Sequence, residues 1–230
     1  MKSDGNFFTT NCNHSKKGLF VTGTDTHVGK TVVSAWLLRR LHGYYWKPIQ
    51  AGLEDETDTM AVQRISELPG HYFIPSRHLL HLPRSPHLAA ARENLTIHLP
   101  DFHLPDLPGP LVVEGAGGVL VPLNATTLMV DLMVHLGLPV VVVARTSLGT
   151  INHTLMTLEA LRSRNLPLVG VVLNGPPDPD NRDAIAHYGQ VHILAEIPRL
   201  ETLTGAELDR VARLEPCGNS WIESLTATNK

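Results

Sequence analysis

The chain has 230 residues, 43% of them apolar, which is enough for one large α/β domain with a buried core. Its 19 basic and 22 acidic residues give a formal net charge of −3, so no nucleic-acid partner is expected. The two cysteines, Cys12 and Cys217, lie far apart and outside any C-x-x-C pattern. This argues against a disulfide framework or a zinc site and favours a reducing cytoplasm.

The N-terminal residues 1–17 are polar and rich in asparagine, and they lack the apolar run of a secretion signal. We therefore expect a flexible N-terminal extension there. The longest apolar stretch, at 136–144, is too short to cross a bilayer, so no membrane partner is expected. The remaining residues, 18–230, are predicted to form a single domain.

Short apolar runs alternate along this domain with longer stretches of helical period. Several runs are apolar on consecutive residues, which is typical of strands buried on both faces of a parallel sheet. The alternation predicts one doubly wound, mostly parallel sheet with helices on both faces. The predicted strands are 18–23, 44–49, 109–115, 138–144, 167–174 and 192–198. The predicted helices are 30–42, 58–67, 86–93, 127–136, 150–164, 180–188 and 204–214.

The segment 69–108 interrupts this alternation, because it is rich in proline and histidine. We expect a long, irregular insertion between two strands. Such insertions in α/β enzymes are often functional, although a tolerated surface excursion is the alternative.

The first predicted strand leads into VTGTDTHVGKT, residues 21–31. The pattern G-x-x-x-x-G-K-[ST] of a phosphate-binding loop fails here by one position, because the first glycine is Gly23 and not residue 24. The context still favours a P-loop, since a strand, a glycine-containing loop and a helix start direct backbone N–H groups and the helix dipole at an anion. The residues predicted to bind the nucleotide are Thr24, Asp25, Thr26, His27, Val28, Gly29, Lys30 and Thr31.

Further motifs follow in a fixed order. They are YWKPIQAG at 45–52, SPH at 85–87, VEGAGG at 113–118 and GTINH at 149–153. Together with the loop, they resemble the dethiobiotin synthetase family over roughly residues 18–200. The resemblance implies a P-loop fold and an enzyme that joins 7,8-diaminopelargonate and CO₂ with MgATP. The family forms a carbamate, phosphorylates it to a carbamic-phosphoric anhydride, and closes the ureido ring of dethiobiotin.

The resemblance implies catalytic roles for Lys30 and Lys47, and Mg²⁺ ligation by Thr31, Asp58 and Glu114. Glu114 is also favoured by its own position, because it ends a buried strand where ligands bind in open α/β sheets. Without the resemblance, a surface lysine at the end of a strand would be the preferred interpretation of Lys47. Asp58 is equally well the N-cap of a helix.

The resemblance also implies the substrate-binding residues. Gly117 and Gly118 would line the diamine pocket. The start of the helix at Gly149, Thr150 and Asn152 would receive the substrate carboxylate across a homodimer interface, because a helix N-terminus attracts anions. An ordinary helix start is the alternative.

The remaining matched positions concern the base and one departure from the family. Asn174 matches the position that recognises adenine, although an Asn at a strand end is also a common turn residue. Pro198, in AEIP, matches the other wall of the base pocket. Ala51 stands where the family often has Ser, Thr or Lys near the substrate, so one polar contact is absent.

Two other protein classes share parts of this pattern. Cobyrinate and cobyric acid amidotransferases have a similar synthetase domain, but they add a glutaminase domain with a nucleophilic cysteine, and the only downstream cysteine here is Cys217. Partitioning-type regulatory ATPases usually carry a lysine early in the loop, and this loop has none before Lys30. A binding module without catalysis is disfavoured, because both lysines and all three predicted metal ligands are present.

Overall fold

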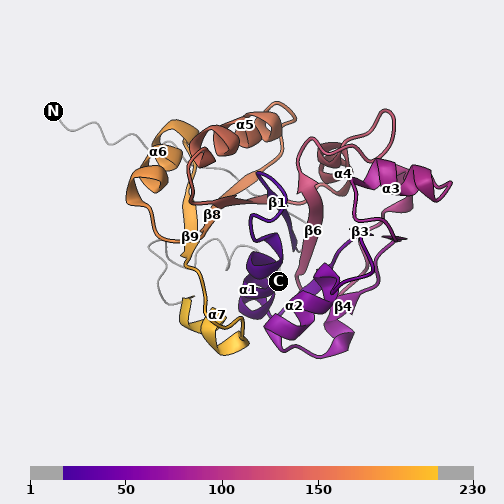
Figure 1. Ribbon diagram of the computed structural model, residues 1–230, viewed down its shortest axis with the longest axis horizontal. Helices are drawn as coiled ribbons and strands as arrows, with labels where there is room; N and C mark the ends of the chain where they lie inside the picture. The colour runs from indigo at the N-terminus through magenta and orange to yellow at the C-terminus, as the bar shows by residue number, and fades with distance from the viewer. Residues whose placement is uncertain (1–17, 212–230) are drawn as a thin grey trace.

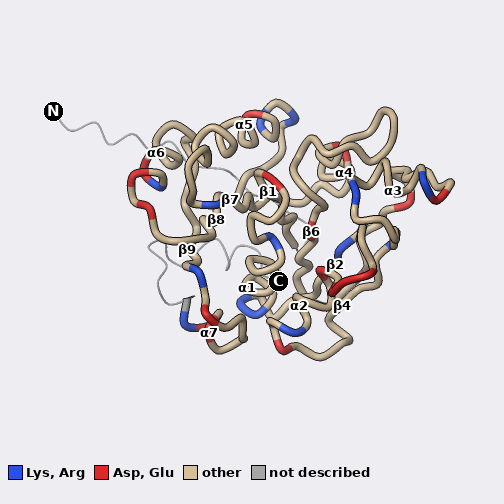
Figure 2. Tube along the Cα trace, viewed as in Figure 1, with Lys and Arg blue, Asp and Glu red and all other residues tan. Residues whose placement is uncertain are grey.

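The computed structural model of the protein describes residues 18–211 (Figure 1). The predicted extension at 1–17 and residues 212–230 of the predicted domain lie outside the described residues. Within the described part, no helix is both long and apolar enough to cross a membrane. Figure 2 shows basic and acidic residues interspersed along the described chain.

Seven parallel strands form the central sheet, in agreement with the predicted doubly wound α/β fold. In spatial order they are β4 (Phe73–Ile74), β2 (Tyr44–Trp46), β6 (Leu111–Gly118), β1 (Gly18–Gly23), β7 (Val140–Arg145), β8 (Leu168–Asn174) and β9 (Ile193–Ile197). A second, two-stranded parallel sheet pairs β3 (Ile49–Ala51) with β5 (His78–Leu80).

Helices cover both faces of the central sheet (Figure 1). One apolar core lies under α1 (Lys30–Leu41), α2 (Asp58–Ser66) and α7 (Gly205–Val211). The other lies under α3 (Pro86–Arg92), α4 (Met129–Leu136), α5 (Thr150–Arg162) and α6 (Pro179–Gly189). Residues of β1 alternate between these cores: Phe20 faces the second, and Leu19 and Val21 face the first. Because both faces are covered, a strand must be apolar on consecutive residues.

The region 69–108 is less irregular than the sequence predicts. It contains the short helical turns Gly70–Tyr72 and Leu99–Asp101 as well as β4, β5 and α3, and β4 extends the central sheet beyond β2. The predicted strand 44–49 is also wrong as one unit, because it divides into β2 and β3 around Lys47 and Pro48. Proline has no N–H group to continue the ladder, and the chain leaves the central sheet at this point.

Candidate active site

The glycine-containing loop connects the carboxyl end of β1 to the first residue of α1, as predicted. The Thr24 N–H donates to the carbonyl of Val143 on β7 (3.0 Å), which fixes the start of the loop on the sheet. The side chains of Asp25, Thr26 and His27 are exposed at its tip. The Lys30 ammonium donates to the Asp25 carbonyl (2.8 Å), so this lysine lies back along its own loop.

Gly29 and Asn174 fit together at the end of this loop. Gly29 has a φ of 99°, in the left-handed region that favours glycine. A Cβ atom added there would lie 2.1 Å from Nδ2 of Asn174. That Nδ2 donates to the carbonyl of the buried Val28 (3.0 Å). The end of β8 therefore supports the loop, and the role of Asn174 in adenine recognition stays a prediction.

We expect Gly29→Ala to weaken ADP binding by about 1–3 kcal/mol, roughly 5- to 150-fold, because the side chain strains the backbone and displaces Asn174. The dissociation constant can be measured by calorimetry. Gly70→Ala is the matched control, since its nearest neighbour would be 3.6 Å away and its φ is ordinary. Equal ADP affinity in both variants would contradict this prediction.

Lys47 lies at the centre of the site and is only 3% exposed. Its ammonium is 2.8 Å from Oδ2 of Asp58 and 3.1 Å from Oε1 of Glu114, and it also donates to the carbonyl of Gly115 (3.0 Å). The Thr31 hydroxyl donates to Oδ1 of Asp58 (2.8 Å) and lies 3.4 Å from Oε1 of Glu114. The structure thus brings together the second lysine and all three predicted metal ligands, next to the loop.

Burial and charge oppose each other in this cluster. Burial lowers the pKa of Lys47, but the carboxylates of Glu114 and Asp58 outweigh it, and the net shift is upward. Burial raises the pKa of Asp58, but the Lys47 ammonium and the hydrogen bonds outweigh it, and the net shift is downward. Lys47 and Asp58 are therefore held in their charged forms.

The donor set of this cluster fits a magnesium ion. One hydroxyl and two carboxylates converge, and Mg²⁺ prefers such hard oxygen ligands together with waters and substrate phosphates. The Asp58 carboxylate does not cap the helix, because Asp58 is the first residue of α2 and Thr57 is the cap, which accepts from the Met60 N–H (3.3 Å). The sequence-based alternative that Asp58 is the cap is therefore wrong. Among residues 18–211, no group of three or more His, Cys, Asp or Glu side chains could hold a metal.

Two side chains that the sequence did not single out support the cluster. The hydroxyl of the buried Tyr45 donates to Oε2 of Glu114 (3.1 Å). Oε1 of Gln50 accepts from the Asp58 N–H (3.1 Å), and its Nε2 donates to the carbonyl of Ala51 (3.2 Å). Tyr45 and Gln50 flank Lys47 in YYWKPIQAG. The only feature of the sequence that could have pointed to them is a polar group inside an apolar run.

The glycines predicted to line the diamine pocket lie beside the loop. Gly118 pairs with Gly23 across β6 and β1, and a Cβ atom on Gly118 would lie 3.6 Å from the Thr24 carbonyl. Gly117 has a φ of 70°. Ala51 ends β3 and is half-buried. All of these residues are near carboxyl ends of strands.

The remaining predicted residues follow other strands. Gly149, with a φ of 90°, precedes α5, and the hydroxyl of the buried Thr150 donates to the Arg145 carbonyl. Asn152 is exposed. These three follow β7, which β1 separates from β6, so within one chain they are not part of the Lys47 cluster. Pro198 directly follows β9 and is half-buried.

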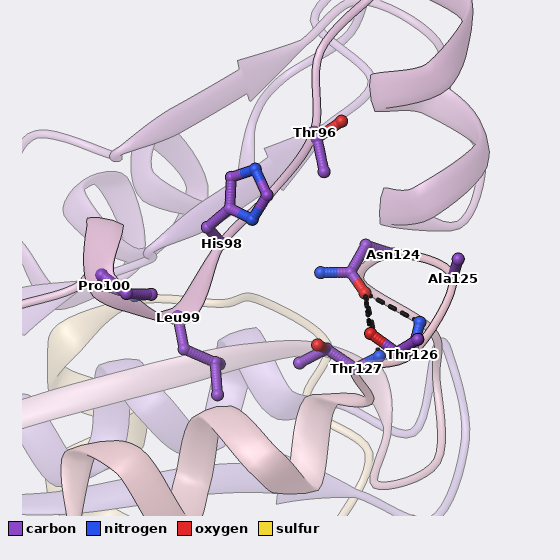
Figure 3. A pocket seen from close by; sticks show the side chains of 8 residues that line it. All are labelled: Thr96, His98, Leu99, Pro100, Asn124, Ala125, Thr126 and Thr127. Carbon is purple, nitrogen blue, oxygen red and sulfur yellow. Dashed lines mark hydrogen bonds between the residues drawn. The ribbon is translucent and has the colours of Figure 1, made fainter.

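A hollow of about 420 Å³ lies beside the turn at 124–127 (Figure 3). Asn124 shapes one wall, because its side-chain oxygen accepts from the N–H groups of Thr126 and Thr127 (both 2.9 Å). None of the predicted site residues lines it. The residues around it are Thr96, His98, Leu99, Pro100, Asn124, Ala125, Thr126 and Thr127.

Burial and the nearby Lys47 ammonium lower the pKa of Lys30 to about 8. Bound phosphates favour the ammonium and raise this pKa, so between the two values nucleotide binding takes up a proton. We therefore expect ADP affinity to fall as the pH rises above about 8. Calorimetry at about pH 8.5 in two buffers of different ionisation enthalpy measures the proton uptake. The uptake should be lost in Lys30→Met, and equal heats for the unmodified protein in both buffers would contradict the prediction.

Comparisons with known proteins identify the family. A family model described as an AAA domain matches residues 17–207. The chain is 55% identical over 192 residues to the ATP-dependent dethiobiotin synthetase of Paramagnetospirillum magneticum, covering 84% of this chain and 93% of that protein. The chain belongs to the ATP-dependent dethiobiotin synthetase family. The dethiobiotin synthetase of Rhodopseudomonas palustris (strain HaA2) is 48% identical, with 84% of this chain and 90% of that protein covered. The resemblance seen in the sequence motifs is thereby confirmed, and the amidotransferase and partitioning alternatives are not favoured.

Solved structures with little sequence identity support the P-loop fold of this dethiobiotin synthetase family member. A ParA family ATPase from Chlorobium tepidum TLS matches with a TM-score of 0.50 at 13% identity, covering 91% of this chain and 98% of that one. The MinC:MinD cell division protein complex of Aquifex aeolicus matches with a TM-score of 0.50 at 11% identity, covering 91% and 93%. At these identities the likeness concerns the fold alone.

Proposed function

We propose that the chain closes the ureido ring of dethiobiotin from 7,8-diaminopelargonate and CO₂, with ATP converted to ADP and phosphate. The observation that carries this proposal is the convergence of Lys47 with Thr31, Asp58 and Glu114 beside the P-loop. Its sequence counterpart is the 55% identity to a protein named as an ATP-dependent dethiobiotin synthetase.

The proposed reaction has three steps. One amine of the substrate adds to CO₂ and gives a carbamate. A carbamate oxygen then attacks the γ-phosphorus of ATP, and ADP leaves. The second amine attacks the carbonyl carbon of the resulting anhydride and expels phosphate, which closes the ring. The phosphoryl step needs positioned positive charge more than covalent chemistry.

Two lysines would supply this charge. Lys30, at the start of α1, would move from the Asp25 carbonyl to the nucleotide phosphates. Lys47, held beside Glu114 and Asp58, would contact both the carbamate and the γ-phosphate. Thr31, Asp58 and Glu114 would hold Mg²⁺, which neutralises phosphate charge when it is bound.

The rest of the site would recognise the two ends of the diamine and the base. Gly117 and Gly118 would line the diamine pocket beside the loop, with Ala51 nearby. Gly149, Thr150 and Asn152 of a second copy would bind the substrate carboxylate, so the proposed active form is a homodimer. Its proposed location is the cytoplasm. Asn174 and Pro198 would form the adenine pocket.

The test is release of ADP by the purified protein with MgATP and bicarbonate, with and without 7,8-diaminopelargonate. We expect ADP release to depend on the diamine and to accompany formation of dethiobiotin. Diamine-independent turnover, or tight MgATP binding with no turnover, would contradict the proposed acceptor.

A further inference from the structure

We propose that Tyr45 is a positioning residue that orients the Glu114 carboxylate for metal binding. This inference rests on the proposed Mg²⁺ site at Thr31, Asp58 and Glu114. Tyr45 is not proposed to contact nucleotide or substrate. It acts through Glu114, to which its hydroxyl donates a hydrogen bond (3.1 Å).

The two oxygens of Glu114 have separate partners. Oε2 accepts from Tyr45, whereas Oε1 faces Lys47 (3.1 Å) and the Thr31 hydroxyl (3.4 Å). A carboxylate that is held at one oxygen can present the other in a single direction. The tyrosine therefore aims Oε1 at the cluster and prevents the carboxylate from turning away.

Burial makes this hydrogen bond consequential. Tyr45 is fully buried and Glu114 is 1% exposed, so water cannot easily replace the hydroxyl. A buried oxygen that loses its donor carries a desolvation cost, and it would seek another partner by rotation. In metal sites, the groups that orient the ligands commonly contribute 10- to 100-fold to metal affinity or activity.

The fold holds Tyr45 from both neighbouring strands. Tyr45 pairs with Val112 of β6, two residues before Glu114, and with Phe73 of β4. The rings of Tyr45 and Phe73 lie 5.9 Å apart between centroids. Because β4 belongs to the 69–108 segment, this segment backs the active site through Tyr45 and is more than a surface excursion.

Packing alone does not require the Tyr45 hydroxyl, since the neighbouring Phe73 packs against the same apolar core without a hydroxyl. The adjacent Tyr44 supplies a matched control. It packs against the opposite core, and its ring lies 5.3 Å from that of Tyr72. Tyr44→Phe removes the same hydroxyl from the same strand without touching Glu114.

The experiment compares Tyr45→Phe, Tyr44→Phe and the unmodified protein. ADP affinity is measured by calorimetry over a range of Mg²⁺ concentrations and again in EDTA. We expect the Mg²⁺ concentration for half-maximal effect to rise about 10- to 100-fold in Tyr45→Phe only. ADP affinity in EDTA should be the same in all three proteins.

Unchanged Mg²⁺ dependence in Tyr45→Phe would overturn the inference. The inference would also be overturned if Tyr45→Phe lost as much ADP affinity in EDTA as it does with Mg²⁺, or if this variant failed to fold. Each result would mean that the hydroxyl stabilises the fold and does not act on the metal. If the ADP affinity of the unmodified protein and of Tyr44→Phe also did not depend on Mg²⁺ concentration, the proposed metal site itself would be wrong.

Discussion

Lys47→Ala should lower kcat for dethiobiotin formation on the order of 100- to 1,000-fold, because in the proposed reaction Lys47 supplies a preorganised positive charge to the phosphoryl transition state. ADP binding should persist, since the loop and Lys30 remain. The measurement is ring closure under saturating substrates, followed by calorimetry with Mg·ADP. Loss of ADP binding together with turnover would contradict a specifically catalytic role.

The same substitution has a cost in stability. Lys47 is 3% exposed and lies between two carboxylates, one of which is 1% exposed. Removing one partner of a buried ion pair typically destabilises a protein by about 3–5 kcal/mol. Arg64→Ala is the matched control, because this half-exposed cation pairs with Glu56 on the surface and should change the free energy of unfolding by about 1 kcal/mol or less. Similar free energies of unfolding for both variants would contradict the prediction that the buried ion pair of Lys47 stabilises the fold more than the surface pair does.

Glu114→Gln should have the second largest effect, because it keeps the shape of the side chain and removes its charge. The amide cannot serve both Lys47 and a metal as the carboxylate would in the proposed site, so we expect kcat to fall ~100-fold and the Mg²⁺ requirement to rise. Turnover measured over a range of Mg²⁺ concentrations tests both effects.

Glu56→Gln provides the control for this variant. Glu56 is an exposed carboxylate that pairs with Arg64 at 2.7 Å and lies outside the cluster. It should turn over at the rate of the unmodified protein. An unaltered Mg²⁺ dependence in Glu114→Gln would mean that the metal binds elsewhere.

The sheet and most helices could be predicted because burial on both faces forces consecutive apolar residues, as in 140–144 of β7. The division of 44–49 was missed because apolar content continues past Pro48 while the ladder does not. The strand β4 was missed because it has two residues and lies in a proline-rich segment. No periodicity can be read from so short a strand.

Without the family resemblance, only the continuous part of the candidate site could be predicted from the residues themselves. The loop is continuous, and its residues stand in one motif. Lys47, by contrast, has the local sequence of a surface lysine, and its buried partner Glu114 lies 67 positions away. The hydroxyl of Tyr45 gives no sequence signal, because its partner lies on another strand and 69 positions away. Long-range pairings of this kind are set by the register of the sheet.

Ring closure is best tested by following the carbon of bicarbonate into the product. The purified protein is supplied with MgATP, 7,8-diaminopelargonate and ¹³C-bicarbonate, and the products are analysed by mass spectrometry. We expect dethiobiotin with the label in its ureido carbon and ADP in equimolar amount. Unlabelled or absent dethiobiotin, with ADP released nonetheless, would contradict the proposed reaction.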